Sequence, residues 1–184
     1  MKAFIIGGSA GAINVLKDIL PNLPSARAFP VIVVLHVLPR GQSLLPTIFR
    51  DRCSWPVKEA ESTEPIENGI VYFAPNDYHL SIEADHSFSL SSEEPVKYSR
   101  PSIDFFFKSA AAVYKSELGA LLLSGANADG AHGMAEILKR GGRCLAQAPD
   151  TAEFSAMPSA ALAISPAISS LATSEIIRFL AGAT

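Results

Sequence analysis

The sequence predicts an α/β protein whose mostly parallel sheet is buried on both faces. The apolar runs 31–35 and 118–123 have the length of buried strands, and segments with helical spacing of apolar residues follow them. Residues 3–12 give in order an apolar strand, a glycine turn and the start of a helix. The apolar content of 48% and the positive mean hydropathy agree with strands that are covered on both sides.

Length, charge and cysteine content narrow the class of protein further. We expect one domain over residues 1–184, because this length buries most apolar surface around a single core. The longest apolar runs fall short of the roughly 18 residues of a membrane span. The net charge of −3, without an aromatic-rich basic patch, argues against a nucleic-acid partner. Cys53 and Cys144 lack metal-ligand spacing, so we expect two buried, reduced thiols in a cytoplasmic protein without a metal site.

The other elements follow from apolar patterning and turn residues. Residues 80–84 and 87–90 alternate apolar and polar, which predicts an antiparallel hairpin at one edge of the sheet. In the same way the chain predicts strands at 57–60, 69–75, 119–123, 143–147 and 168–172. It also predicts a helix at 41–52, a helix that begins after an N-cap at Ser102, and a helix that ends at the glycines 141–142. Two last helices are predicted to begin at Pro158 and after a cap at Thr173 or Ser174.

The turn after the first strand presents a candidate nucleophile. Residues 7–11 read GxSxG, in which small neighbours allow a sharp turn that exposes the Ser9 hydroxyl at a helix N-terminus. A dinucleotide-binding turn would need glycines at 9 and 12 and an acidic residue after the second strand, and the chain has Ser9, Ala12 and His36 there. A helix cap and a nucleophile remain as interpretations of Ser9.

Three chemically active side chains follow predicted buried strands. Ser9, His36 and Asp129 stand at carboxyl ends of strands, which meet in one crevice in an open parallel sheet. A serine needs a base, and an imidazole base needs a carboxylate that fixes its tautomer, so we expect the Ser9 hydroxyl within about 2.6–3.2 Å of a His36 ring nitrogen. A structural histidine and a helix-capping aspartate are the alternatives. The order Ser, His, Asp differs from that of the α/β hydrolases.

The remaining histidines carry weaker expectations. His79, beside the turn at 75–78, is expected to be a hydrogen-bonded loop residue. His86 stands in the hairpin turn and is expected to be solvated, and His132 is expected on the surface of a helix.

Six motifs stand in one collinear order along nearly the whole chain. They are IGGSAGA at 6–12, LHVLP at 35–39, APNDYHL at 74–80, RPSID at 100–104, LSGANADG at 123–130 and AQAPDTAEFSAMPSAA at 146–161. The series resembles the catalytic domain of the chemotaxis protein-glutamate methylesterases, the CheB family, whose patterns read IGxSxGG, QHxP, APGxxHL, RPSxD, LTGMGxDG and AQDPxTxxxxGMPxxA. Each motif alone is weak, but six in this order are highly specific.

The resemblance implies a three-layer α/β/α fold with a doubly wound, mostly parallel sheet, and hydrolysis of glutamyl methyl esters on methylated chemoreceptor signalling helices. Ser9 matches the family nucleophile, His36 the general base and Asp129 the aspartate that orients it. The backbone N–H groups of Ala10 and Ala126 would hold the oxyanion. No metal or organic cofactor is needed. Some relatives also deamidate receptor glutamines, which makes this a second candidate activity.

The chain departs from the family pattern in several places. Many members carry an N-terminal receiver domain, and this chain begins at the first catalytic strand, so we expect a stand-alone form with a separate regulatory protein as a candidate partner. Asn127 and Ala156 replace glycines, and Leu35 replaces the glutamine before the histidine. If position 127 needs a positive φ, asparagine adopts it more readily than most residues. A catalytically silent CheB-like binding module is the alternative function, although the retained triad residue types favour an enzyme.

Overall fold

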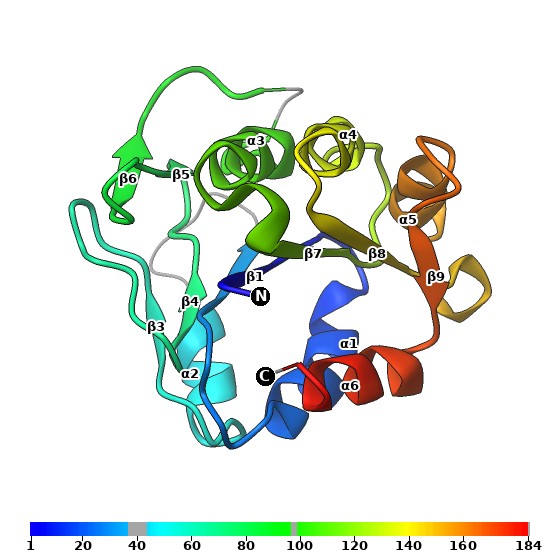
Figure 1. The fold of residues 1–184 in the computed structure, drawn as a ribbon, viewed down its shortest axis with the longest axis horizontal. Coiled ribbons are helices and arrows are strands. Elements are labelled where there is room, and N and C mark those ends of the chain that lie inside the picture. Colours follow the sequence, from blue (N-terminus) through cyan, green and yellow to red (C-terminus); the bar gives the residue numbers. More distant parts are fainter. Residues whose placement is uncertain (37–43, 97–98, 184) are drawn as a thin grey trace.

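A central parallel sheet organises the structure, a computed structural model that describes residues 1–36, 44–96 and 99–183. In these residues seven strands form one sheet in the order β3-β4-β2-β1-β7-β8-β9, and all their pairings are parallel (Figure 1). The strands are β1 Ala3–Gly8, β2 Val31–Leu35, β3 Val57–Glu59, β4 Val71–Phe73, β7 Leu118–Leu122, β8 Arg143–Gln147 and β9 Ser169–Leu171. Positions 37–39 of the LHVLP motif and 41–43 of the predicted second helix lie outside the described residues.

Helices cover both faces of this sheet. They are α1 Ala12–Ile19, α2 Leu45–Arg50, α3 Ile103–Tyr114, α4 Ala131–Lys139, α5 Ala156–Leu162 and α6 Thr173–Ala181, with short 3-10 turns at Leu20–Asn22, Lys115–Glu117 and Pro149–Thr151. Figure 1 shows α3, α4 and α5 on one side of the strands and α1, α2 and α6 on the other. The three-layer, doubly wound α/β/α fold predicted from the sequence is confirmed.

Alternation along β1 explains why both faces need a helical layer. Ala3 and Ile5 pack in the same apolar cluster as α3 and α4, whereas Phe4 and Ile6 pack with α1 and α6. Successive strand residues point to opposite faces, and all four of these side chains are fully buried. Burying each large apolar side chain contributes about 1.5–3 kcal/mol, so neither helical layer can be removed without a large loss of stability.

The predicted hairpin is present as a separate two-stranded sheet. Strands β5 His79–Ile82 and β6 Phe88–Ser91 pair antiparallel, β5 packs against α3, and Leu80 and Phe88 belong to the same buried apolar cluster as that helix. The hairpin therefore lies beside the first turn of α3, where the His79 ring accepts a hydrogen bond from the Ser102 N–H. The start of α3 is therefore held from both the main sheet and the hairpin.

Several local expectations need correction. His79 lies in β5 and not in a loop, because its backbone pairs with Ser91 of β6, while its ring is hydrogen-bonded as expected, to the Glu94 carbonyl and the Ser102 N–H. Helix α5 begins at Ala156, two residues before the predicted proline. Helix α6 has Ala172 as its N-cap in place of Thr173 or Ser174, and the Glu175 carboxylate accepts a hydrogen bond from the Ala172 N–H.

Two further features bear on the class of protein. Cys144 is buried and Cys53 is half-buried, and both thiols are free, which agrees with the predicted reduced state while correcting the burial of Cys53. Within the described residues, no helix combines the length and the apolar character needed to cross a membrane.

Candidate active site

The predicted site residues lie on three neighbouring strand ends. Ser9 directly follows β1, and His36 directly follows β2, which is paired with β1 on one side. Asp129 lies in the loop between β7 and α4, and β7 is paired with β1 on the other side. Backbone hydrogen bonds join these ends, from the Ser9 N–H to the Ser124 carbonyl at 2.9 Å and from the His36 N–H to the Gly8 carbonyl at 3.1 Å.

The turn that carries Ser9 depends on a glycine two residues later. Gly11 has φ +81°, a left-handed conformation that side chains disfavour, and a Cβ there would lie 2.6 Å from the Ser124 hydroxyl. Gly11 is also the N-cap of α1, and no side chain caps this helix. The capping interpretation of Ser9 is therefore wrong, and the half-buried hydroxyl is left available for another purpose.

His36 and Asp129 form a close, shielded pair. The His36 Nε2 atom lies 2.8 Å from the Asp129 Oδ2 atom, and the side chains are 11% and 1% exposed. The structural interpretation of His36, in which backbone groups hold the ring, does not describe this contact, because the partner of Nε2 is a carboxylate. Such a pair stabilises the protonated form of an imidazole, which is what a general base requires.

The Asp129 carboxylate also lies at the N-terminus of α3. It accepts hydrogen bonds from the Ile103 N–H at 2.7 Å, the Asp104 N–H at 3.1 Å and the Ser102 hydroxyl at 3.2 Å. Ser102 in turn accepts from the Phe105 N–H, which confirms it as the predicted N-cap. The prediction that Asp129 caps the helix after it is wrong, because Gly130 is the N-cap of α4 and no side chain caps that helix; the Asp129 carboxylate supports the start of α3 instead.

These contacts set the charge of Asp129. Burial raises the pKa of its carboxyl, but hydrogen bonds from His36 and from the Ile103 and Asp104 N–H groups outweigh burial, so the pKa lies below the ordinary value of 3.8. The positive end of a helix dipole acts in the same direction. The carboxylate is therefore ionised at neutral pH and can orient an imidazole.

The second ring nitrogen of His36 faces two side chains that sequence reasoning did not assign. The Asn127 Nδ2 atom lies 3.4 Å from His36 Nδ1, and the Ser99 hydroxyl lies 3.5 Å from the same atom. The expected hydrogen bond between the Ser9 hydroxyl and His36 is not formed among the described contacts. Asn127 was visible in the sequence only as a departure from a family glycine, and Ser99 only as the residue before the RPSID motif.

The two predicted oxyanion donors remain unengaged. Ala10 and Ala126 are both exposed, and neither backbone N–H donates to an acceptor in the described parts of the chain. Asn127 is not among the described residues with positive φ, so its backbone conformation does not require the glycine of the family pattern.

A buried serine, Ser124, ties the loops of the site together. Its hydroxyl donates to the Ala10 carbonyl at 2.7 Å and accepts from the Phe154 N–H at 2.9 Å. Its own N–H donates to the Gln147 side-chain carbonyl at 2.9 Å. Because both hydrogen-bonding roles of its hydroxyl are taken, Ser124 has a structural role that its place after a buried strand does not reveal.

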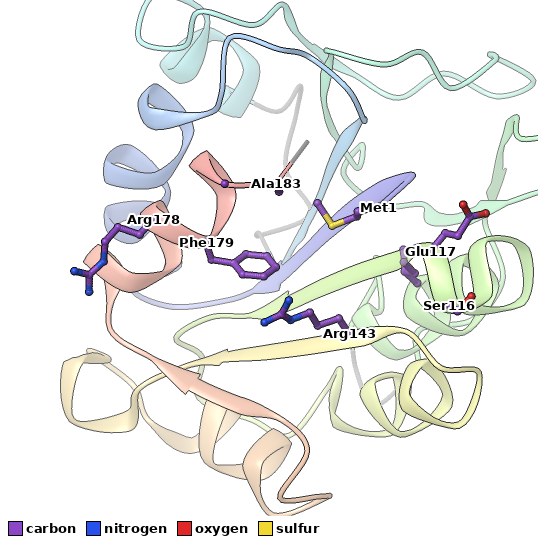
Figure 2. A pocket seen from close by; sticks show the side chains of 9 residues that line it. Met1, Ser116, Glu117, Arg143, Arg178, Phe179 and Ala183 are labelled. Carbon is purple, nitrogen blue, oxygen red and sulfur yellow. The ribbon is translucent and has the colours of Figure 1, made fainter.

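Two cavities lie among the described residues, one at the sheet and one beside α3 and α4. One of about 490 Å³ is at the amino ends of β7 and β8, where Arg143 extends over the Phe179 ring at 4.6 Å (Figure 2). It contains none of the predicted site residues. A second of about 490 Å³ is lined by Phe105, His132 and Asp104, whose N–H donates to Asp129, so this cavity borders the candidate site.

Two observations concern the side chains that bind metals or act as thiol nucleophiles. They contain no group of three or more histidine, cysteine, aspartate or glutamate side chains arranged to hold a metal ion. Burial raises the pKa of the Cys144 thiol to about 12, so this thiol is protonated at neutral pH. A hydroxyl, an imidazole and an ionised carboxylate at adjacent strand ends are the groups suited to acyl transfer.

Comparison with solved structures defines the class of protein. The crystal structure of the Thermotoga maritima CheB methylesterase catalytic domain superposes with a TM-score of 0.94, covering 100% of this chain and 98% of that domain at 32% identity. The fold and its likeness to this methylesterase domain define an α/β carboxylic ester hydrolase.

Sequence comparison gives the family. The model of the CheB methylesterase family matches residues 4–180, and the chain belongs to this family. A Leptospira interrogans protein, provisionally named protein-glutamate methylesterase/protein-glutamine glutaminase, is 45% identical over 161 residues, which cover 88% of this chain and 83% of that protein. A Methanospirillum hungatei protein named protein-glutamate methylesterase/protein-glutamine glutaminase 2 is 33% identical over 180 residues. The matched region covers 98% of this chain and 51% of that protein.

Proposed function

We propose that this protein hydrolyses glutamyl methyl esters on the signalling helices of methylated chemoreceptors. Ser9 is the nucleophile, His36 the general base and Asp129 the residue that orients and stabilises the imidazolium. The observation that carries the proposal is the 2.8 Å contact between His36 and a buried, ionised Asp129, placed one strand away from a serine in a glycine turn. Family membership and the names of the relatives support the choice of substrate.

The reaction proceeds through an acyl-enzyme. The Ser9 hydroxyl oxygen attacks the ester carbonyl carbon while its proton passes to His36 Nδ1, the ring nitrogen that Asp129 does not use. The backbone N–H groups of Ala10 and Ala126 bind the oxygen of the tetrahedral intermediate. The imidazolium then returns the proton to the methoxy oxygen, and methanol leaves. A water molecule repeats the sequence on the acyl-enzyme and releases the glutamate carboxylic acid and the free Ser9 hydroxyl.

The first step requires a local rearrangement at His36. In the structure Nδ1 faces the Asn127 amide and the Ser99 hydroxyl, so the Ser9 hydroxyl must replace these neighbours when the ester binds. Hydrogen bonds of this kind are commonly long before substrate binds.

Glutamine deamidation is a second candidate activity. The names of relatives include a protein-glutamine glutaminase activity. Deamidation uses the same acyl-enzyme, with ammonia leaving in place of methanol. A separate regulatory protein is a further proposed partner, and the cytoplasm, where receptor signalling helices are found, is the proposed location.

Methanol release from a methylated receptor fragment tests the proposal. Ser9→Ala should lower turnover by roughly 10³-fold or more, because the nucleophile is removed. The free energy of unfolding should change by less than about 0.5 kcal/mol, since Ser9 makes no side-chain hydrogen bond among the described contacts. Ser116→Ala, an exposed serine at the opposite edge of the sheet, is the matched control and should keep wild-type turnover.

Two outcomes would contradict the proposal. Unchanged turnover in Ser9→Ala would remove this residue as the nucleophile. A wild-type protein that releases neither methanol from the methyl ester nor ammonia from the glutamine form of the fragment would instead be a binding module.

A further inference from the structure

The side chain of Asn127 has a defined orientation. Its carboxamide oxygen Oδ1 accepts a hydrogen bond from the Asp129 N–H at 3.0 Å. A backbone N–H can only donate, so the oxygen of the amide must be the atom that faces it. The amide nitrogen Nδ2 is then the atom that lies 3.4 Å from His36 Nδ1.

This orientation fixes the tautomer of His36. An amide nitrogen donates and does not accept, so the Nδ1 atom that faces it must carry a lone pair and no proton. The proton of the neutral ring is therefore on Nε2, where it is donated to Asp129 Oδ2. These hydrogen bonds form a closed ring, which runs from the Asp129 N–H through the Asn127 amide and the His36 imidazole to the Asp129 carboxylate.

We propose that Asn127 is a positioning residue for His36, which keeps the neutral ring with Nδ1 unprotonated and turned toward the crevice. This inference rests on the proposed function, because Nδ1 is the nitrogen that must receive the Ser9 proton. Asn127 stands where the family pattern has a glycine, which has no side chain to form these hydrogen bonds.

A simple turn role does not account for the whole arrangement. The hydrogen bond from the Asp129 N–H to Oδ1 is an ordinary Asx turn, which asparagine and aspartate form equally well. A turn residue has no need of a donor pointed at the imidazole. The Asn127 backbone also lacks the positive φ that would favour asparagine over other residues.

The substitution Asn127→Asp separates the two roles. Aspartate keeps an oxygen for the Asp129 N–H but replaces the donor at Nδ1 with a second negative charge beside the ring. In the described parts of the chain, the charged group that contacts this ring is Asp129, while Ser99 and Asn127 are neutral. A carboxylate at 127 favours the protonated ring, so the base is free only at higher pH.

The pH profile of ester hydrolysis tests the inference. In Asn127→Asp the acid limb of kcat/KM should move to higher pH by about one unit, with a roughly tenfold loss at neutral pH that is recovered in alkali. Asn127→Gly adds no charge beside the ring, so it should keep the acid limb near its wild-type position and lose only the fixed tautomer of the neutral ring. Asn22→Asp is the matched control and should keep the wild-type profile, because this exposed amide after α1 donates, among the described contacts, to the Asp18 carbonyl oxygen and lies on another element than His36.

Nitrogen NMR of the imidazole gives a reading that needs no substrate. In alkali, where the imidazole is neutral, wild-type His36 should carry its proton on Nε2 and none on Nδ1, and Asn127→Asp should keep a proton on Nδ1 to higher pH than the wild type. A wild-type pH profile in Asn127→Asp, or a neutral wild-type ring with its proton on Nδ1, would overturn the role of Asn127. A wild-type protein without esterase activity but with the expected tautomer would overturn the proposed function and leave the positioning intact.

Discussion

Two histidines lie beside the first turn of α3 and have opposite environments. His79 is 1% exposed, its Nδ1 accepts from the Ser102 N–H and its Nε2 donates to the Glu94 carbonyl, both at 3.2 Å. His36 is 11% exposed, with Nε2 on the Asp129 carboxylate and Nδ1 facing the Asn127 amide. Ser102 connects the two, because its N–H bonds His79 and its hydroxyl bonds Asp129.

The partners of each ring decide what the ring can do. Both ring nitrogens of His79 are used by backbone groups, the Ser102 N–H and the Glu94 carbonyl, so this ring serves the packing of the hairpin on α3. Protonation of His36 would strengthen its contact with a carboxylate, so this ring can carry a proton during a reaction. Proximity to the site therefore does not by itself make a histidine a catalytic base.

Substitution of each histidine by glutamine should separate chemistry from stability. His36→Gln should lower ester turnover by roughly 10³-fold or more, because no base remains to take the serine proton. His79→Gln should keep turnover within about tenfold but lower the free energy of unfolding by about 1–3 kcal/mol, because a buried hydrogen-bonded ring is replaced. Methanol release and denaturant unfolding measure the two effects. Equal loss of turnover in both variants would remove the distinction between the rings.

The carboxylate partner should matter more for rate than for folding. Asp129→Asn should lower kcat by roughly 10³–10⁴-fold, because an amide that donates to His36 favours the wrong tautomer. The same variant should lose about 1–3 kcal/mol of stability, since the start of α3 loses a charged acceptor. Asp18→Asn, on the exposed face of α1, is the matched control. Retention of wild-type kcat in Asp129→Asn would show that the pair with His36 is structural.

The pH dependence of the free energy of unfolding should reveal the contribution of the Asp129 carboxylate to stability. The pKa of Asp129 is lowered in the folded protein from the ordinary value of 3.8, so the folded state binds this proton less readily than the unfolded chain. Its stabilising contribution is full above about pH 4 and is lost as the pH falls through the lowered folded value. Unfolding between pH 5 and pH 2 should therefore show a steeper acid loss in the wild type than in Asp129→Asn. A shallower loss in the wild type would mean that burial dominates and that the pKa is raised.

The strand ends were predictable from the sequence, and the contacts between them were not. Apolar runs and glycine turns located β1, β2 and β7, and the geometry of parallel sheets then brought Ser9, His36 and Asp129 to one edge. The apolar periodicity predicts which face of α3 is buried. It does not predict that the first turn of α3 contacts the loop with Asp129, which lies 26 residues further along the chain. The hydrogen bonds from Ile103 and Asp104 to Asp129 therefore had no signal in the sequence.

The sequence also did not show which side chains lie next to the His36 Nδ1 atom. Pattern reasoning paired His36 with Ser9, since each follows a buried strand, but it cannot rank the neighbours of Nδ1 within a few tenths of an ångström. Asn127 and Ser99 occupy that position because their loops approach the ring from β7 and from the segment before α3. The strand position of His79 was missed for a related reason, since the turn before it resembled a longer loop.

A third histidine, His86, should show the smallest effect and so gives the baseline for the other two. It lies in the hairpin turn, is exposed, has φ 63° and rests its ring 5.1 Å from that of Tyr114. His86→Asn should leave turnover unchanged and alter the free energy of unfolding by less than about 1 kcal/mol, because asparagine accepts positive φ and only a surface ring contact is lost. Denaturant unfolding and methanol release check both parts. A loss as large as that of His79→Gln would mean that ring packing, and not hydrogen bonding to backbone groups, determines what a histidine contributes here.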